Sequence, residues 1–185
     1  MKMDHSYRIL SPRLLLRPLT EHDLDQVRSW RNQEHIRIWF QDDQLIEPEQ
    51  HFNWYERYRT NDSDMMFIAV RLDKEKPIGT AALYRINTFK RKAEFGRVLI
   101  GDSESQGQSY GEEIVKAVTQ FGLNTLGLQS IELFVKVTNT RAIRIYMNCG
   151  YVHDSSYRHP VAKGSSALIR MVCFASKRRR EGRDS

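Results

Sequence analysis

Cysteines are scarce in this 185-residue sequence: Cys149 and Cys173 are the only two, and they form no C-x-x-C pair. Such separated thiols favour a reducing compartment and argue against a disulfide framework. Long apolar runs are also missing, because the longest covers residues 65–70, far short of the ~20 residues that a membrane span needs. The amino terminus lacks the apolar region of a signal peptide. We therefore expect a cytoplasmic protein with no membrane segment.

Internal repeats, low-complexity linkers and metal-ligand spacings are absent as well. The histidines stand at positions 5, 22, 35, 51, 153 and 159, in no pattern typical of a metal site, so no metal is predicted. With 40% hydrophobic residues, a chain of this length can bury a core without disulfides or metal. We predict a single domain over residues 1–176 and a basic, disordered tail over residues 177–185.

The excess of positive charge is modest and uneven. The chain holds 29 basic and 23 acidic residues, for a net charge of +6, and the tail KRRREGRDS alone supplies half of it, with five basic and two acidic residues. A further basic group comprises Arg85, Lys90, Arg91, Lys92 and Arg97. This balance suits an anionic partner, either nucleic acid or a phosphorylated small molecule. No helix-turn-helix or RNP pattern is present, so a non-catalytic nucleic-acid-binding module is the less favoured alternative.

Hydrophobic periodicity predicts an α/β (α+β) domain with a mixed central sheet and helices on both faces, in the order βααβββαβαβ. Strands are expected at 13–17, 65–71, 77–87, 92–100, 130–136 and 167–175, with a further strand near Tyr151. Helices are expected at 21–33, 48–58, 109–125 and 139–148.

The loop after the predicted strand 92–100 is the first candidate functional segment. Its residues are Gln106, Gly107, Gln108, Ser109, Tyr110 and Gly111. A helix that begins here leaves backbone N–H groups without partners, and glycine lets a ligand approach them closely. The loop is therefore a candidate phosphate site, and an ordinary strand-to-helix turn is the alternative.

The second candidate segment, residues 139–151, encodes a short helix. Asn139 is a natural N-cap, and Gly150 is a natural residue after the helix end. Ala142 and Tyr146 are four residues apart and share a helix face. The small side chain leaves room for a narrow molecule to pass toward the tyrosine hydroxyl. The alternative is a Tyr146 that simply packs in the core.

Together these segments resemble the GCN5-related N-acetyltransferase (GNAT) superfamily. Gln106 and Gly111 match the ends of its Q/R-x-x-G-x-G/A loop, and Ser109 stands where glycine is usual, with a hydroxyl that can cap the helix. The family motif N-x-x-A-x-x-x-Y-x-x-x-G-[FY] is matched at every fixed position by Asn139, Ala142, Tyr146, Gly150 and Tyr151. The opening residues 13–20 look like the subgroup that acetylates protein amino termini, polyamines and amino sugars.

The resemblance implies the acyl-CoA N-acyltransferase fold and acetyl-CoA as the cofactor. Pantetheine would then lie between the strands 92–100 and 130–136, with the pyrophosphate on the loop. The implied cofactor-binding residues are Val98, Leu99, Ile100, the six loop residues above, Asn139 and Arg144. A main-chain N–H near Val98 or Leu99 would donate to the thioester oxygen, where negative charge develops.

Acetyl transfer to an amine needs a proton for the leaving thiolate. Tyr146 is the candidate general acid toward the CoA sulfur. A phenol pKa of about 10 is matched to a thiol pKa of about 8.5, so the phenol holds its proton at neutral pH and can share it.

The amine must also lose a proton, and Glu94 is the candidate base, directly or through water. It interrupts an apolar strand, and simple alternation puts it on the same face as Val98. The alternative is a glutamate that forms an ion pair with Arg97 or Lys92. His51 is the second choice of base.

The resemblance implies that acceptor specificity comes from the first two helices and their connection, here the region 30–55, which holds all three tryptophans. The pattern R-N-x-x-x-I-R-x-W/F in this region looks like bacterial transferases that acetylate nucleotide-linked amino sugars. The candidate substrate-binding residues are Arg31, Arg37, Trp39, Phe40 and His51. The arginines would hold a diphosphate, and the aromatic rings would stack on a sugar or base. The alternative is that these aromatics pack two helices onto the sheet.

We therefore expect an acetyl-CoA-dependent N-acetyltransferase that acts on a small-molecule primary amine, first of all an amino sugar. The alternatives are a protein amino-terminal transferase of the ribosomal-protein type and a polyamine or aminoglycoside transferase. A polyamine favours an acidic pocket, which Asp42, Asp43 and Glu47 can supply. A homodimer is left open, as is the length of the acyl group.

Overall fold

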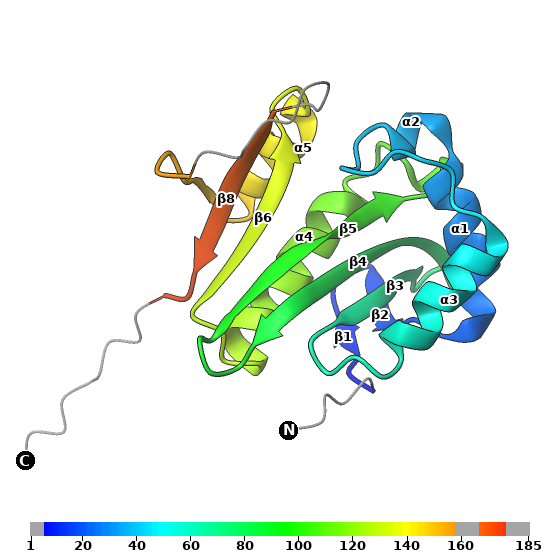
Figure 1. Ribbon diagram of the computed structural model, residues 1–185, viewed down its shortest axis with the longest axis horizontal. Helices are drawn as coiled ribbons and strands as arrows, with labels where there is room; N and C mark the ends of the chain where they lie inside the picture. Colours follow the sequence, from blue (N-terminus) through cyan, green and yellow to red (C-terminus); the bar gives the residue numbers. More distant parts are fainter. Residues whose placement is uncertain (1–5, 158–166, 177–185) are drawn as a thin grey trace, which may run out of the picture.

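The computed structural model describes residues 6–157 and 167–176. These residues form an eight-stranded sheet in the order β1-β2-β3-β4-β5-β6-β8-β7 (Figure 1). All neighbouring strands are antiparallel except the parallel pair β5 and β6. The strands are β1 Ile9–Leu10, β2 Leu14–Pro18, β3 Met65–Arg71, β4 Lys76–Asn87, β5 Lys92–Ile100, β6 Ser130–Lys136, β7 Val152–His153 and β8 Leu168–Phe174.

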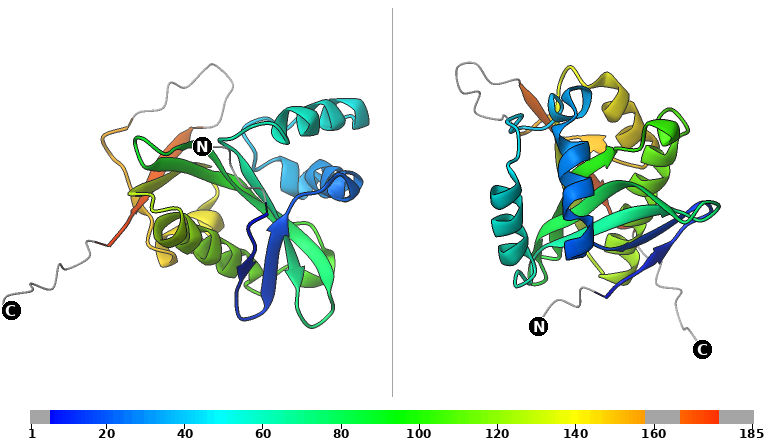
Figure 2. Two further views of the ribbon diagram at one scale, coloured as in Figure 1. Left: turned by 90° about the horizontal axis from the view of Figure 1, so that it is seen from below. Right: turned by 90° about the vertical axis from the view of Figure 1, so that its right-hand side faces the viewer.

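Helices cover both faces of this sheet. One face carries α1 Leu24–Asn32, α2 Glu34–Arg37 and α3 Pro48–Tyr58, and the other carries α4 Tyr110–Gln120 and α5 Thr140–Asn148 (Figure 2). Each layer has its own core: one contains Phe95 of β5 and Ile114 of α4, and the other contains Ile68 of β3 and Trp30 of α1. The indole of Trp30 lies where a Cβ at Gly101 would stand, so glycine lets α1 reach the end of β5.

The predicted fold class is confirmed, and the structure adds two short elements, β1 and α2. A two-residue strand and a single helical turn are too short to show a period, so the pattern does not indicate them. The helix expected over 21–33 begins with a 3₁₀ turn at Glu21–Asp23, and the one expected to reach 125 ends with a π turn at Phe121–Thr125. The tail predicted over 177–185 lies outside the described residues. No described helix has the length and apolar character of a membrane span.

Strand β5 contains a bulge at Arg97. Ala82 of β4 pairs with Gly96, whereas Thr80 pairs with Leu99, so β5 has one more residue than its partner across this stretch. Arg97 takes a left-handed conformation, with φ of 50°. A bulge of this kind re-aims the side chains that follow it, because it breaks the alternation between the two faces.

The bulge makes one sequence prediction wrong. Phe95 and Val98 both pack in the core beneath α4, although they are three positions apart and regular alternation would put them on opposite faces. Glu94 neighbours Phe95 on a regular stretch of strand and therefore points to the opposite face. Simple alternation puts Glu94 and Val98 on one face, but the structure puts them on opposite faces.

The sheet splits between β5 and β6. These strands pair only where Lys92, Ala93 and Glu94 lie beside residues 130–132, and they diverge beyond that point. β6 stays paired with β8 along its whole length, so the split leaves the far end of β5 without a strand neighbour on that side (Figure 1).

Candidate active site

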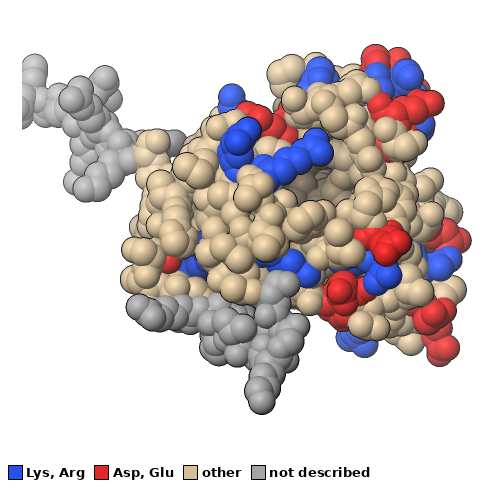
Figure 3. Space-filling model, turned by 90° about the horizontal axis from the view of Figure 1, so that it is seen from above, with Lys and Arg blue, Asp and Glu red and all other residues tan. Residues whose placement is uncertain are grey.

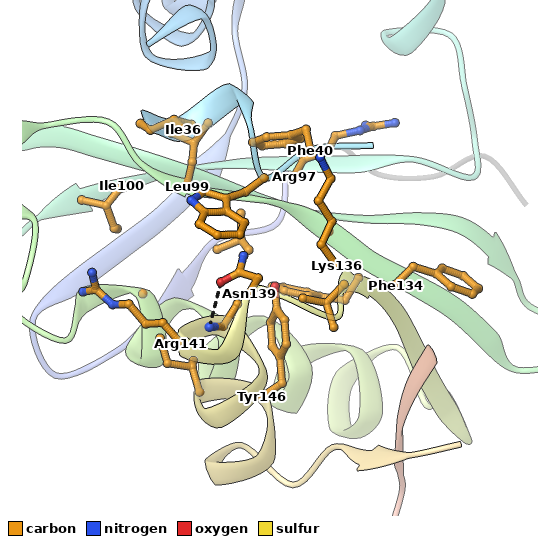
Figure 4. A pocket seen from close by; sticks show the side chains of 18 of the residues that line it. Ile36, Phe40, Arg97, Leu99, Ile100, Phe134, Lys136, Asn139, Arg141 and Tyr146 are labelled. Atoms are coloured by element: carbon orange, nitrogen blue, oxygen red, sulfur yellow. Dashed lines mark hydrogen bonds between the residues drawn. The ribbon is translucent and has the colours of Figure 1, made fainter. Parts of the chain in front are cut away.

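A pocket of about 1050 Å³ occupies the split between β5 and β6, and we call it the cleft. Its walls are the end of β5, the loop before α4, the end of β6 and one face of α5 (Figure 4). All but one of the predicted cofactor-binding residues line it. They are Val98, Leu99, Ile100, Gln106, Gly107, Ser109, Tyr110, Gly111, Asn139 and Arg144.

The exception is Gln108, whose side-chain amide donates to the Glu104 carbonyl and faces away from the cleft. Gln106 instead donates to the carbonyl of Ile100 at 3.1 Å and so ties the loop to the end of β5. Its amide nitrogen also lies 3.2 Å from Nε2 of His35.

The loop has the backbone of an anion site. Gly107 and Ser109 both have left-handed conformations, with φ of 78° and 62°. The predicted Ser109 cap is wrong, since its hydroxyl makes no capping hydrogen bond, but the residue keeps the backbone angle that glycine usually provides. An added Cβ at Gly107 or Gly111 would meet nothing within 4 Å, so a ligand can lie against the backbone.

The backbone N–H groups of residues 107–112 have no acceptor among the described residues. They lie at the start of α4, where the helix dipole favours negative charge. This arrangement fits a pyrophosphate, which offers several oxygen acceptors to neighbouring N–H groups. Cations also lie close by, because Lys136, Arg141 and Arg144 line the cleft, and Lys and Arg side chains border the hollow in Figure 3.

Helix α5 positions the candidate acid. The predicted caps are confirmed: Oδ1 of Asn139 accepts from the backbone N–H of Ala142 at 3.2 Å, and Gly150 has φ of 92°. Tyr146 is buried and points from α5 into the cleft (Figure 4). Its ring packs edge-on against Phe95, with ring centroids 6.2 Å apart.

The Tyr146 hydroxyl makes no hydrogen bond to a described residue. Burial raises the pKa of this phenol above its ordinary value, and the neighbouring Cys149 thiol raises it further. The hydroxyl is therefore protonated at neutral pH and can act as a donor to a group in the cleft.

Glu94 also lines the cleft, and only 4% of its surface is exposed. Its carboxylate accepts hydrogen bonds from the Tyr84 hydroxyl at 2.5 Å and from Nη1 of Arg85 at 2.7 Å. The alternative partners, Arg97 and Lys92, are both wrong: Arg97 instead pairs with Asp64 at 2.8 Å. Tyr84 pairs with Glu94 across the two strands, and Arg85 lies at an irregularity of β4 with φ of 51°, so the two neighbouring side chains both reach the carboxylate.

A smaller pocket of about 340 Å³, which we call the side pocket, adjoins the cleft beneath α1 and α3. The two share Arg31, Phe40, Asp42, Arg97 and Leu99. The Arg31 guanidinium lies over the Phe40 ring, 3.7 Å from its centroid, and donates to the carbonyl of Asp42.

The predicted substrate-binding residues differ in which pocket they line. Trp39 lines the cleft alone, and Arg31 and Phe40 line both pockets. His51 lines the side pocket alone, stacked on Trp54, so it lies away from the cleft where a base would act. Arg37 lines neither pocket, because Nη1 of its guanidinium donates to the carbonyl of residue 43 at 2.7 Å.

Sequence reasoning missed two basic residues in this site, Lys136 and Arg141, which both line the cleft. Arg141 stands at a variable position of the second motif and Lys136 lies outside both, and Nζ of Lys136 donates across the cleft to the carbonyl of Ile38 at 2.7 Å. Of the proposed acidic residues, only Asp42 lines a pocket, whereas Glu47 caps α3. A basic residue at the end of a strand is a common surface feature, so no sequence signal distinguishes Lys136.

A split sheet with a helix N-terminus that can hold a pyrophosphate, and a buried tyrosine beside an open strand edge, define an acyltransferase that uses a CoA thioester. The family model of an acetyltransferase (GNAT) domain matches residues 13–152. The chain belongs to this family, and it is an acetyl-CoA-dependent N-acetyltransferase.

Several polyamine acetyltransferases are similar to the chain. The spermidine N(1)-acetyltransferase of Escherichia coli K12 is 30% identical over 149 residues, which cover 78% of this chain and 75% of the relative. The Vibrio cholerae enzyme of the same name is 27% identical over 150 residues, covering 78% and 82%. The crystal structure of V. cholerae spermidine N-acetyltransferase with CoA and spermine superposes with a TM-score of 0.80 at 24% identity, covering 90% of this chain and 98% of that one.

Proposed function

We propose that this chain transfers the acetyl group of acetyl-CoA to a primary amine of a small molecule, with polyamines such as spermidine as the first acceptor class to test. The relatives named above support polyamines better than the amino sugar that we expected first. The observation that carries the transfer itself is the cleft, which brings Tyr146 and Glu94 to the two sides of the split sheet.

Acetyl-CoA supplies an activated thioester carbonyl. The free N–H groups of residues 107–112 hold the pyrophosphate, and the open edge of β5 orients the pantetheine arm. A main-chain N–H near Val98 or Leu99 donates to the carbonyl oxygen, where charge develops as the amine attacks.

Two side chains handle the protons. Glu94 takes a proton from the ammonium, directly or through water, and thereby frees the nitrogen lone pair for attack. Tyr146 gives its proton to the sulfur as the carbon–sulfur bond breaks. Burial in α5 keeps this hydroxyl protonated at neutral pH, so a proton is present when the thiolate leaves.

Release of free thiol from acetyl-CoA tests this proposal with spermidine, spermine, amino sugars, aminoglycosides and peptides as acceptors. We expect turnover with at least one amine. If no acceptor releases thiol and CoA does not raise the melting temperature, the proposal fails.

A homodimer and a cytoplasmic location remain predictions. The V. cholerae relative has a dodecameric structure, so the oligomeric state of this chain should be measured by light scattering.

A further inference from the structure

Two buried side-chain nitrogens in the described part of the chain have no hydrogen-bond partner: Nη1 of Arg31 and Nδ1 of His51. Both residues line the side pocket, although one comes from α1 and the other from α3. Buried polar groups in folded proteins are nearly always hydrogen-bonded. Two such atoms around one pocket therefore indicate a ligand that supplies the missing partners.

Arg31 defines the first requirement on that ligand. A guanidinium only donates hydrogen bonds, so Nη1 needs an acceptor atom. Its other terminal nitrogen already donates to the Asp42 carbonyl, and the group makes no ion pair with a described residue. Burial lowers the pKa of Arg31, and the Asp42 and Asp43 carboxylates offset only part of this effect. An oxyanion offsets this desolvation best, because it brings both acceptor atoms and negative charge.

His51 defines the second requirement. Burial and the Arg28 cation lower the pKa of the ring, so it is neutral at pH 7, and a backbone hydrogen bond with Leu24 acts in the other direction. Since Nδ1 has no partner, the ring nitrogen bonded to Leu24 is Nε2, which donates. Nδ1 of a neutral ring is then an acceptor. The ligand must therefore also offer an O–H or N–H donor.

The side pocket has a mostly basic lining, which favours an anionic ligand as Arg31 does. Three arginines line it, and Asp42 is the single carboxylate among its described lining residues. Arg97 is paired with Asp64, but Arg57 makes no ion pair with a described residue. Plain polyamines carry positive charge and no oxygen, so they can satisfy His51 but leave Arg31 without an acceptor.

We infer that the side pocket binds a carboxylate or phosphate group carried by the acceptor amine itself. The pocket shares Arg31 and Leu99 with the cleft, so one molecule can place its oxyanion in the pocket and extend its amine into the cleft. The inference rests on the proposed acetyl transfer to a primary amine. It narrows the acceptor to an amine that also carries an acidic group, in contrast to the polyamines named for the relatives.

Matched pairs of amines test the inference, because their members differ only in the oxyanion. Cadaverine with lysine tests a carboxylate, and glucosamine with glucosamine 6-phosphate tests a phosphate. In at least one pair, we expect kcat/KM for the acidic member to exceed that of the plain amine at least tenfold. Arg31→Met should remove this preference, measured as the ratio of kcat/KM between the acidic and the plain member of each pair. Arg31→Lys, which keeps the charge without the planar fork, should restore part of it.

Arg59→Met is the control, because Arg59 pairs with Glu56 on the surface and lines neither pocket. It should leave the preference unchanged. Melting temperatures of all variants show whether a loss reflects misfolding.

Two outcomes separate this inference from the proposed function. If plain polyamines are acetylated as well as or better than every acidic partner, or if the preference survives Arg31→Met, the inference is overturned while acetyl transfer stands. If no amine is acetylated, the transfer fails, and the pocket is judged by thermal shift alone. A stabilisation by lysine or glucosamine 6-phosphate that Arg31→Met abolishes would support the oxyanion site, and its absence would overturn it.

Discussion

The two sides of the cleft are built differently. The cofactor side consists of contiguous segments, residues 106–112 and 139–150, and offers mainly backbone N–H groups. The proposed acceptor side, together with the adjoining side pocket, consists of separate side chains: Glu94 of β5 in the cleft, Arg31 of α1 in both pockets and His51 of α3 in the side pocket. A site made of backbone N–H groups tolerates side-chain substitutions as long as the backbone conformation is unchanged. A site made of side chains changes its chemistry with each substitution, so one family can keep its cofactor and vary its acceptor.

The largest effect is expected from Tyr146→Phe on the cofactor side. The substitution keeps the ring in its packing against Phe95 and removes only the proton donor. We expect kcat to fall by about 100-fold or more, with CoA affinity nearly unchanged, since the hydroxyl acts on the departing sulfur. Steady-state kinetics and calorimetric CoA titration measure the two quantities. An unchanged kcat would remove Tyr146 as the acid.

Glu94→Gln tests the acceptor side and is expected to lower kcat/KM by about 100-fold. The loss should be greatest below neutral pH, where the amine is most fully protonated and depends most on a base. At high pH the amine loses its proton to water, and the two enzymes should converge. The pH profiles of both proteins check this. A loss that is independent of pH would indicate a positioning role, with Tyr84 and Arg85 holding the carboxylate.

A smaller effect is expected on the pH dependence of the free energy of unfolding, through His51 in the side pocket. Its pKa is lower in the folded protein, so the unfolded chain binds more protons as the pH falls below about 6.5. Stability should therefore decrease from pH 7.5 to pH 5.5, and His51→Gln should lose less over this range. Arg28 and Asp25 are the charged groups that act on the ring, and their effects oppose each other. Urea unfolding at both pH values measures the difference. Equal losses in the two proteins would contradict the assignment.

The smallest effect is expected from Ser109→Gly. Ser109 has φ of 62° and no capping bond, so glycine relieves a strained conformation without removing a contact. The greater freedom of glycine in the unfolded chain offsets part of this gain. We expect a stabilisation of up to about 1 kcal/mol and unchanged CoA affinity, measured by urea unfolding and calorimetry. A destabilised variant would show that the hydroxyl has a role in the loop.

Sequence reasoning succeeded where a feature is local. The caps at Asn139 and Gly150 follow from residue preferences at helix ends, and the structure confirms both. The loop before α4 was recognised for the same reason, since a glycine-containing turn and the helix start lie within a few residues. The side chain of Gln108 donates to the Glu104 carbonyl and does not line the cleft, because spacing does not say which way a loop side chain turns.

The prediction from the two-residue alternation of a strand was wrong at Arg97 in β5. Alternation assumes a regular strand, and a bulge depends on the register with the neighbouring strand, which no single segment encodes. The error moved Glu94 to the wrong face relative to Val98, and its partners were missed because they lie on β4.

By itself, the sequence determined the order of the longer strands and helices, the two caps of α5 and the glycine-containing turn before α4, because each depends on residues close together in the chain. Only the tertiary structure decided where β5 bulges, which groups hold Glu94, and that Arg31 and His51 meet around one pocket. Those features need strands in register and helices packed on a sheet, so they arise from contacts between residues far apart in the chain.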